Sequence, residues 1–382
     1  MNDEPLCEAS DNALGFLADP LSNWPNDDLL LDERTREYFL KHHAAAFPIL
    51  DWPRLRDLFN RHEDLANSYR DRSRRSGMIA VAATTVGLLI TAFSPVLNAV
   101  LPSFDWLIGI SATLFIVIGS GLALEYLIRG NMKYRWLANR LWTERTRQFY
   151  FQYLIQNLDV AAKAMNDPEA LTALVRDRDS KLAEYKKITM ASIREVMDRL
   201  SKDRAARDPW LVDAWRSPPA LPATSENLSE LLHILQRQRF GIQKRYVGHK
   251  LAQTVNSPAW RASVTAIVSN VLTLVLPLTA LAIAFCILFG HSSNDPLLLG
   301  LVAVQAAAAA IVAGIRAFDV GFRWSDDGNR YGWYLARTEE LERTFLAEGV
   351  EGKIEALRQM ERASYEELRL FLQAQNSAHF LI

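Results

Sequence analysis

The sequence predicts an all-α integral membrane protein with four transmembrane helices in two hairpins and long cytoplasmic juxtamembrane helices. Three observations support this fold class. Four long windows lack Asp, Glu, Lys and Arg, short turns join these windows in pairs, and basic residues collect at the open ends of each pair but not in the turns. A helix needs about 20 apolar residues to cross a hydrocarbon core of ~30 Å, and each window is about that long.

Whole-chain averages conceal this pattern. Of 382 residues, 49% are hydrophobic and the formal net charge is -1, because apolar windows are averaged with highly charged segments. Cys7 lies in a polar stretch and Cys286 in an apolar run, which suggests neither a disulfide nor a metal site. The acidic first residues lack the basic and apolar regions of a cleavable signal peptide.

The four spans are predicted at about residues 78–101, 106–128, 262–289 and 296–316. Backbone polar groups in lipid must be satisfied internally, so apolar runs of this length should be helices. The alternative is a soluble protein with two buried helical hairpins. The length of the runs disfavours that alternative, because buried helices of soluble proteins are usually shorter.

The orientation follows from the flanking charges. By the positive-inside rule, loops rich in Lys and Arg next to membrane spans lie on the cytoplasmic side. Basic residues flank the open ends of both hairpins, and neither hairpin turn contains Lys or Arg. Both termini and the segment between the hairpins are therefore predicted to be cytoplasmic, which leaves almost nothing outside to recognise an external ligand. The flanking basic residues are Arg70, Arg72, Arg74, Arg75, Arg129, Lys133, Arg135, Arg140, Lys244, Arg245, Lys250, Arg261, Arg316 and Arg323.

The sequence indicates an internal duplication, in which each of two similar units contains one hairpin. YRWLANRLWTERTRQF follows the second span and YGWYLARTEELERTF follows the fourth, and both contain Tyr-x-Trp, Leu-Ala, Arg, Glu-Arg-Thr and Phe. Chance similarity between charged juxtamembrane helices is the alternative. The predicted organisation is an N-terminal cytoplasmic extension (1–57), a first two-span unit (58–208), a Pro-rich linker (209–225) and a second two-span unit (226–382). Within the extension, a helix is predicted from Asp32 to Phe47, where Pro48 stops it.

This layout resembles tandem SLATT domains, which are two-transmembrane effector domains of bacterial conflict systems. The matching positions are Tyr69, Tyr134, Trp136, Arg140 and Glu144 in the first unit, and Gln243, Tyr246, Lys250, Trp333, Arg337 and Glu340 in the second. The resemblance implies a homo-oligomeric effector of anti-phage defence in the bacterial inner membrane. It also implies control by a nucleotide signal that a partner nucleotidyltransferase makes. The N-terminal extension and the long tail of the first unit depart from a minimal SLATT domain, so the form of control is open.

No catalytic motif is visible. The sequence contains no phosphate-binding Walker loop, zinc-protease motif, Cys-x-x-Cys pair or nucleophilic-serine elbow. His42 and His43 are adjacent, and neighbours in a helix point to different faces, which is poor spacing for metal ligands. We therefore predict no enzyme activity and no cofactor.

Two basic stretches interleaved with aromatic residues are the candidate ligand site. Phosphates attract Arg and Lys, and nucleobases stack on aromatic rings. The alternative is the positive-inside rule together with attraction to anionic lipid, with the aromatic residues as interfacial anchors. The predicted nucleotide-binding residues are Arg237, Arg239, Lys244, Arg245, Tyr246, Lys250, Lys133, Arg135, Trp136, Arg140 and Arg147.

Polar residues inside the spans are the candidates for lining a pore. They are Glu125, Asn98, Asn270 and Gln305. The alternative is ordinary hydrogen bonding between helices, and Glu125 is also placed to pair with Arg129 four residues later. No cluster of Asp, Glu or His suggests a proton relay, so a passive pore is favoured over a transporter.

The sequence thus leads to two hypotheses. The first is an oligomeric, ligand-controlled pore or membrane-disrupting effector that a cytosolic nucleotide or oligonucleotide opens or holds closed. The second is a non-conducting membrane anchor that recruits a cytosolic partner protein.

Overall fold

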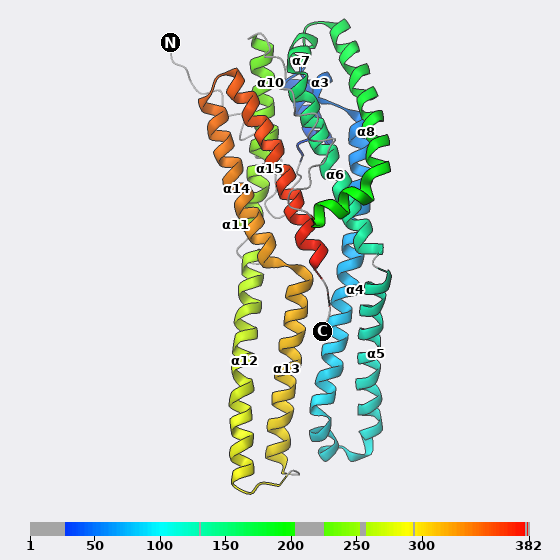
Figure 1. Cartoon of the computed structure of the whole chain (residues 1–382), viewed down its shortest axis with the longest axis vertical. Helices are drawn as coiled ribbons and strands as arrows, with labels where there is room; N and C mark the ends of the chain where they lie inside the picture. Colours follow the sequence, from blue (N-terminus) through cyan, green and yellow to red (C-terminus); the bar gives the residue numbers. More distant parts are fainter. Residues whose placement is uncertain are drawn as a thin grey trace. The chain divides into compact units, whose positions relative to one another are not determined.

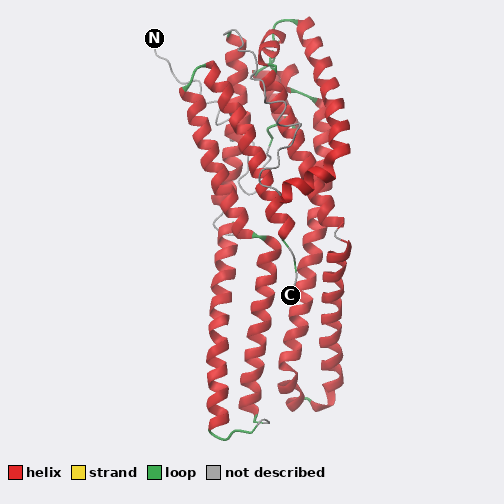
Figure 2. Ribbon diagram, viewed as in Figure 1, coloured by secondary structure: helices red, strands yellow, loops and turns green. Residues whose placement is uncertain are grey.

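The computed structural model describes residues 27–129, 131–202, 225–252, 257–292, 295–378 and 380. Side chains are described for these residues except 125–129, 131, 188–194, 196 and 198–202. Helices form almost all of this part of the chain, and no strand occurs in it (Figure 2). The predicted Pro-rich linker lies outside the described residues up to position 224, as does the N-terminal extension up to position 26.

Four helical stretches are long and apolar enough to cross a membrane, judged by length and composition over the described residues. The predicted spans agree, to within one residue at their ends, with parts of α4 (Pro53–Val100), α5 (Asp105–Arg129), α12 (Pro258–Leu288) and α13 (Pro296–Phe322) (Figure 1). A 3-10 turn, η1 (Pro102–Phe104), joins the first pair. The prediction of four apolar helices in two hairpins is therefore confirmed.

The other helices are short or charged. The helix predicted from Asp32 to Phe47 is wrong at its end: α2 (Glu33–His42) stops earlier, and Pro48 lies near the start of α3 (Phe47–Leu50), where a missing N–H costs nothing. The remaining helices are α6 (Asn131–Gln156), α7 (Leu158–Ala164), α8 (Pro168–Lys202), α10 (Glu226–Gln236), η2 (Arg237–Gly241), α11 (Ile242–Ala252), α14 (Trp324–Ala347) and α15 (Val350–Ser377).

The chain divides into two compact units, and each unit combines segments that are far apart in sequence. The core unit is the described part of Met1–Arg61, Trp142–Gln253 and Arg330–Arg369. The span unit is the described part of His62–Leu141, Thr254–Asn329 and Leu370–Ile382, and it contains all four predicted spans. Helices α4, α6, α14 and α15 each contribute residues to both units.

Small residues allow close packing within the span unit. A Cβ on Gly119 of α5 would lie 2.7 Å from the backbone nitrogen of Thr84 and 2.8 Å from the carbonyl oxygen of Ala80, both in α4. Helices in membranes commonly approach each other at such small residues. Near the chain end, Phe380 contacts the positions of Gly77 in α4 and Gly321 in α13.

Replacing Gly119 by alanine is expected to lower the thermal stability of the span unit, because the new methyl group meets backbone atoms that cannot rotate away. Overpacking of this kind costs about 1–3 kcal/mol. Heating the detergent-solubilised full chain and measuring the fraction that stays monodisperse checks this. Gly121→Ala is the matched control, since no atom lies within 4 Å of its added Cβ. Equal stability of the two variants would contradict the expectation.

The interior of the core unit is unusually polar. The segment of α6 from Trp142 to Ile155 is buried at every position except the half-buried Glu144. Aromatic contacts surround it: the rings of Phe149 and Tyr185 stack with centroids 4.6 Å apart, and Trp52 lies 5.4 Å from Tyr153. The same segment also carries buried Arg, Thr and Gln side chains, so polar groups must find partners inside the unit.

Candidate functional site

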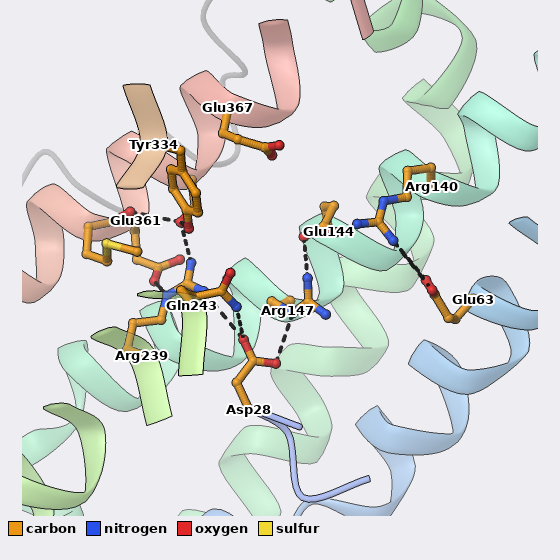
Figure 3. Close-up of polar contacts among 12 residues, drawn as sticks. Asp28, Glu63, Arg140, Glu144, Arg147, Arg239, Gln243, Tyr334, Glu361 and Glu367 are labelled. Atoms are coloured by element: carbon orange, nitrogen blue, oxygen red, sulfur yellow. Dashed lines mark hydrogen bonds and ion pairs between the residues drawn. The ribbon is translucent and has the colours of Figure 1, made fainter. Parts of the chain in front are cut away.

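A buried network of charged side chains gathers around Asp28 in the core unit (Figure 3). Asp28 precedes α2, and its side chain is 0% exposed. Its Oδ1 accepts a hydrogen bond from Nε of Arg147 at 3.0 Å, and its Oδ2 accepts one from Nε2 of Gln243 at 2.9 Å. A guanidinium nitrogen of Arg239 lies 3.5 Å from the same Oδ2. One carboxylate therefore joins the N-terminal segment to α6, η2 and α11.

Arg239 is held from several sides. It lies in η2, a π-helical turn that buries Gln238, Arg239 and Phe240. Its Nε donates to the carboxylate of Glu361 in α15, and a terminal nitrogen donates to Oγ of Ser364 at 2.7 Å. The guanidinium carbon also lies 4.6 Å above the ring of Phe151. Single π turns within helices are rare and frequently occur at functional sites.

The Arg147 side chain has a similar environment on the other side of Asp28. Its second nitrogen donates to Glu144 at 2.6 Å, one helical turn away, and its guanidinium carbon lies 5.1 Å from the ring of Phe59. Tyr334 of α14 completes the network through a 2.8 Å hydrogen bond between its hydroxyl and that of Ser364. The network thus connects the N-terminal segment with helices from both halves of the chain.

Burial dominates the electrostatics of this network. It raises the pKa of Asp28, although Arg147 and Arg239 oppose the rise. It raises the pKa of Glu361 to about 7, against the attraction of Arg239. Burial alone would lower the pKa of Arg239, but Glu361, Tyr334 and Asp28 outweigh it and leave that pKa raised. All three pKa values are raised, so each group is favoured in its protonated form. For Glu361 the raised pKa lies near neutral pH.

The structure places the predicted nucleotide-binding residues in two groups. In the core unit, Arg147 and Arg239 bind carboxylates as described above, and Lys244 pairs with Glu342. The Nε of Arg245 donates to the carbonyl of Gly241 at 3.3 Å. Lys250 lies 5.6 Å above the ring of Tyr246, and Arg237 is half-buried.

The second group belongs to the span unit. Lys133 donates to the carbonyl oxygen of Asn376 at 3.0 Å, and burial lowers its pKa to about 8. Arg140 pairs with Glu63 at 3.2 Å, and Arg135 lies 5.7 Å from the ring of Tyr69. Trp136 is buried, with its ring 5.9 Å from that of Phe371.

The predicted pore-lining residues differ in their position along the helices and in their exposure. Asn98 lies near the end of α4, where its amide donates to Asp105 across the hairpin turn. Asn270 is exposed on α12, and Gln305 is half-buried on α13. The structure records no contact between these three described side chains. The side chain of Glu125 lies outside the described residues.

Sequence reasoning missed Asp28 and Glu361. Asp28 appears in an acidic segment that precedes a short helix, so nothing in its surroundings predicts burial. Glu361 left a detectable signal, because it falls on the apolar stripe of α15 between Leu357 and Leu368, at helical spacing. A carboxylate on a buried stripe requires a partner, and Arg239 supplies it.

No group of three or more His, Cys, Asp or Glu suited to a metal ion occurs in the described part of the chain. Searches of protein-family models, curated proteins and solved structures found no match to this chain.

Proposed function

We propose that this protein is an oligomeric, ligand-controlled pore or membrane-disrupting effector of bacterial anti-phage defence. The observation that carries the proposal is the sharing of helices between the units. The span unit holds all four predicted spans, and α4, α6, α14 and α15 also contribute residues to the polar core unit. A change in the core unit that moves any of these helices therefore acts directly on a segment of the span unit.

The charge pattern supports control from the cytosolic side of the membrane. Basic residues flank the open ends of both hairpins and are absent from the turns, which supports a cytosolic core unit. The resemblance to tandem SLATT domains supplies the second argument, since it implies an effector that answers a cytosolic nucleotide signal. In this proposal the nucleotide binds members of the predicted basic set that solvent can reach, such as the exposed Arg135 and the half-buried Arg237, whereas Arg239 and Arg147 are buried and contact carboxylates.

The experiment is a flux measurement on the purified full chain in liposomes of defined lipid. We expect release of trapped K⁺ or of a small dye without ligand or with one of the probes ATP, cyclic di-GMP and cyclic di-AMP. Liposomes containing heat-denatured protein control for leakage. The absence of release under every one of these conditions, with the protein inserted and helical, would contradict the pore.

A non-conducting membrane anchor that recruits a cytosolic partner is the second candidate. The observation that favours it is that Arg147, Arg239 and Lys244, which were predicted to bind a nucleotide, each contact a carboxylate of the same chain. Lack of flux together with lack of nucleotide binding would favour this candidate, whereas flux of any kind would exclude it.

A further inference from the structure

We propose that the second hairpin, formed by α12 and α13, is the surface through which copies of this chain associate within the membrane. The inference rests on the proposed assignment of these helices as membrane spans. It names the face on which self-association depends, and it is tested without reference to flux.

The first step concerns how polar side chains in the spans are satisfied. Thr84, Thr85 and Thr91 of α4 each donate to the carbonyl four residues earlier, at 2.8–2.9 Å. Thr113 of α5 does the same at 2.8 Å. Such hydroxyls cost little in lipid because their own helix provides the acceptor. Thr265, Thr273 and Thr279 of α12 follow the same rule.

Two side-chain amides do not follow it. Asn270 on α12 and Gln305 on α13 form no hydrogen bond with any described residue. An amide has two donor hydrogens and one acceptor oxygen with two lone pairs, more than a helix can satisfy from its own backbone. On the first hairpin the amide nitrogen of Asn98 donates to Asp105 beside the hairpin turn, although the amide oxygen of Asn98 accepts no hydrogen bond from a described residue.

Both amides lie well inside the apolar stretches. At 1.5 Å per residue, Asn270 is about 13 Å along the helix from Arg261, the nearest charged residue of α12. Gln305 is about 15 Å from Asp295 and about 16 Å from Arg316, which places it near the middle of its span. Neither amide is near enough to a polar boundary to reach water along a short side chain, and acyl chains offer no hydrogen bonds.

A second copy of the same chain is the occupant that solves this. An amide is both donor and acceptor, so the same residue on a symmetry-related copy is its own complement. Exposed Ile267, Val271 and Leu274 flank Asn270, and exposed Ala306 and Ala309 lie beside Gln305, where small side chains permit close approach of another helix. An aqueous path between copies would satisfy the amides too, and it likewise requires more than one chain.

The test is the association of the purified full chain in bilayers of pure phosphatidylcholine, where no other protein is present. Single-molecule photobleaching over a range of protein-to-lipid ratios gives the oligomeric state. We expect the wild type to form oligomers. For Asn270→Leu and for Gln305→Leu we expect a dissociation constant about tenfold larger than that of the wild type. Thr113→Val, an exposed span position on the first hairpin, is the matched control and should behave as the wild type.

Disulfide formation provides a measurement that tolerates poor folding of the leucine variants. In a background with Cys7→Ser and Cys286→Ala, oxidation should link copies through Asn270→Cys and not through Thr113→Cys. A wild type that stays monomeric at every ratio, or leucine variants that associate as strongly as the wild type, would overturn the proposal. Flux from a protein whose association is unaffected by these variants would overturn it and leave the pore proposal intact.

Discussion

Replacing Arg239 by methionine is expected to lower the free energy of unfolding of the core unit by about 3–5 kcal/mol. Its guanidinium contacts Asp28 and Glu361, whose side chains are both 0% exposed. Removing the cation leaves two buried carboxylates short of one partner, and breaking a buried pair in this way costs far more than losing a surface pair. Denaturant titration of the full chain in detergent, followed by tryptophan fluorescence, measures the change.

Two further variants make this result specific to the network. Arg343→Met is the matched control, because Arg343 is exposed and, among the described residues, its Nε donates to the carbonyl of Glu339 in its own helix, at 3.3 Å. The double variant Arg239→Met with Glu361→Leu removes both charges and should recover part of the lost stability. A loss below about 1 kcal/mol for Arg239→Met would mean that the ion pairs are not what holds these segments together.

The second large effect is a pH dependence carried by Glu361. Burial raises the pKa of its carboxyl group from 4.5 to about 7, so the folded protein holds a proton that the unfolded chain has already released. Its contribution to stability is therefore fully present below about pH 4.5 and is lost as the pH rises through about 7. Asp28 acts in the same direction. We expect the core unit to be about 2–3 kcal/mol less stable at pH 8 than at pH 5.

Unfolding of the full chain at pH 5, 6, 7 and 8 measures this slope. Glu361→Gln should flatten it, because the amide cannot titrate. Glu351→Gln, an exposed position at the start of the same helix, should leave the slope unchanged. A wild type whose stability is constant or rises over this range would show that Arg239 keeps Glu361 ionised, contrary to the expectation.

The four apolar helices could be predicted from the sequence because a long run without charged residues allows few other structures. A run of about 20 residues without charge has few alternatives to a membrane helix, and the structure forms helices at all four windows. Local signals also succeed at helix starts: Asp32 accepts a hydrogen bond from the backbone nitrogen of Arg34, as an N-cap should. The early end of α2 at His42 was not predictable, because no glycine or proline marks it.

The candidate site was harder to predict because the same residue types occur both in basic helices at a membrane surface and in a buried polar core. Arg145, Arg147 and Trp142 read as a basic, aromatic helix at a membrane surface, yet all three are buried in the core unit. Whether such a helix is buried or lies at a surface depends on partners distant in sequence, and Asp28 lies more than a hundred residues from Arg147. Composition within a window contains no information about a carboxylate so distant, whereas the spacing of Glu361 on α15 does indicate burial.

The burial of α6 on all sides from Leu141 to Ile155 has a consequence for how this protein tolerates substitutions. Most helices have a solvent side on which substitutions are nearly neutral, so tolerance rises and falls every three to four positions. From Leu141 to Ile155 no such side exists among the described residues. Saturation mutagenesis should therefore find that substitutions lower stability at consecutive positions throughout this segment. Conservative substitutions of its polar residues should be as damaging as substitutions of its apolar residues. In such a segment we expect larger changes to occur as paired substitutions, in which a residue of the helix and its neighbour change together.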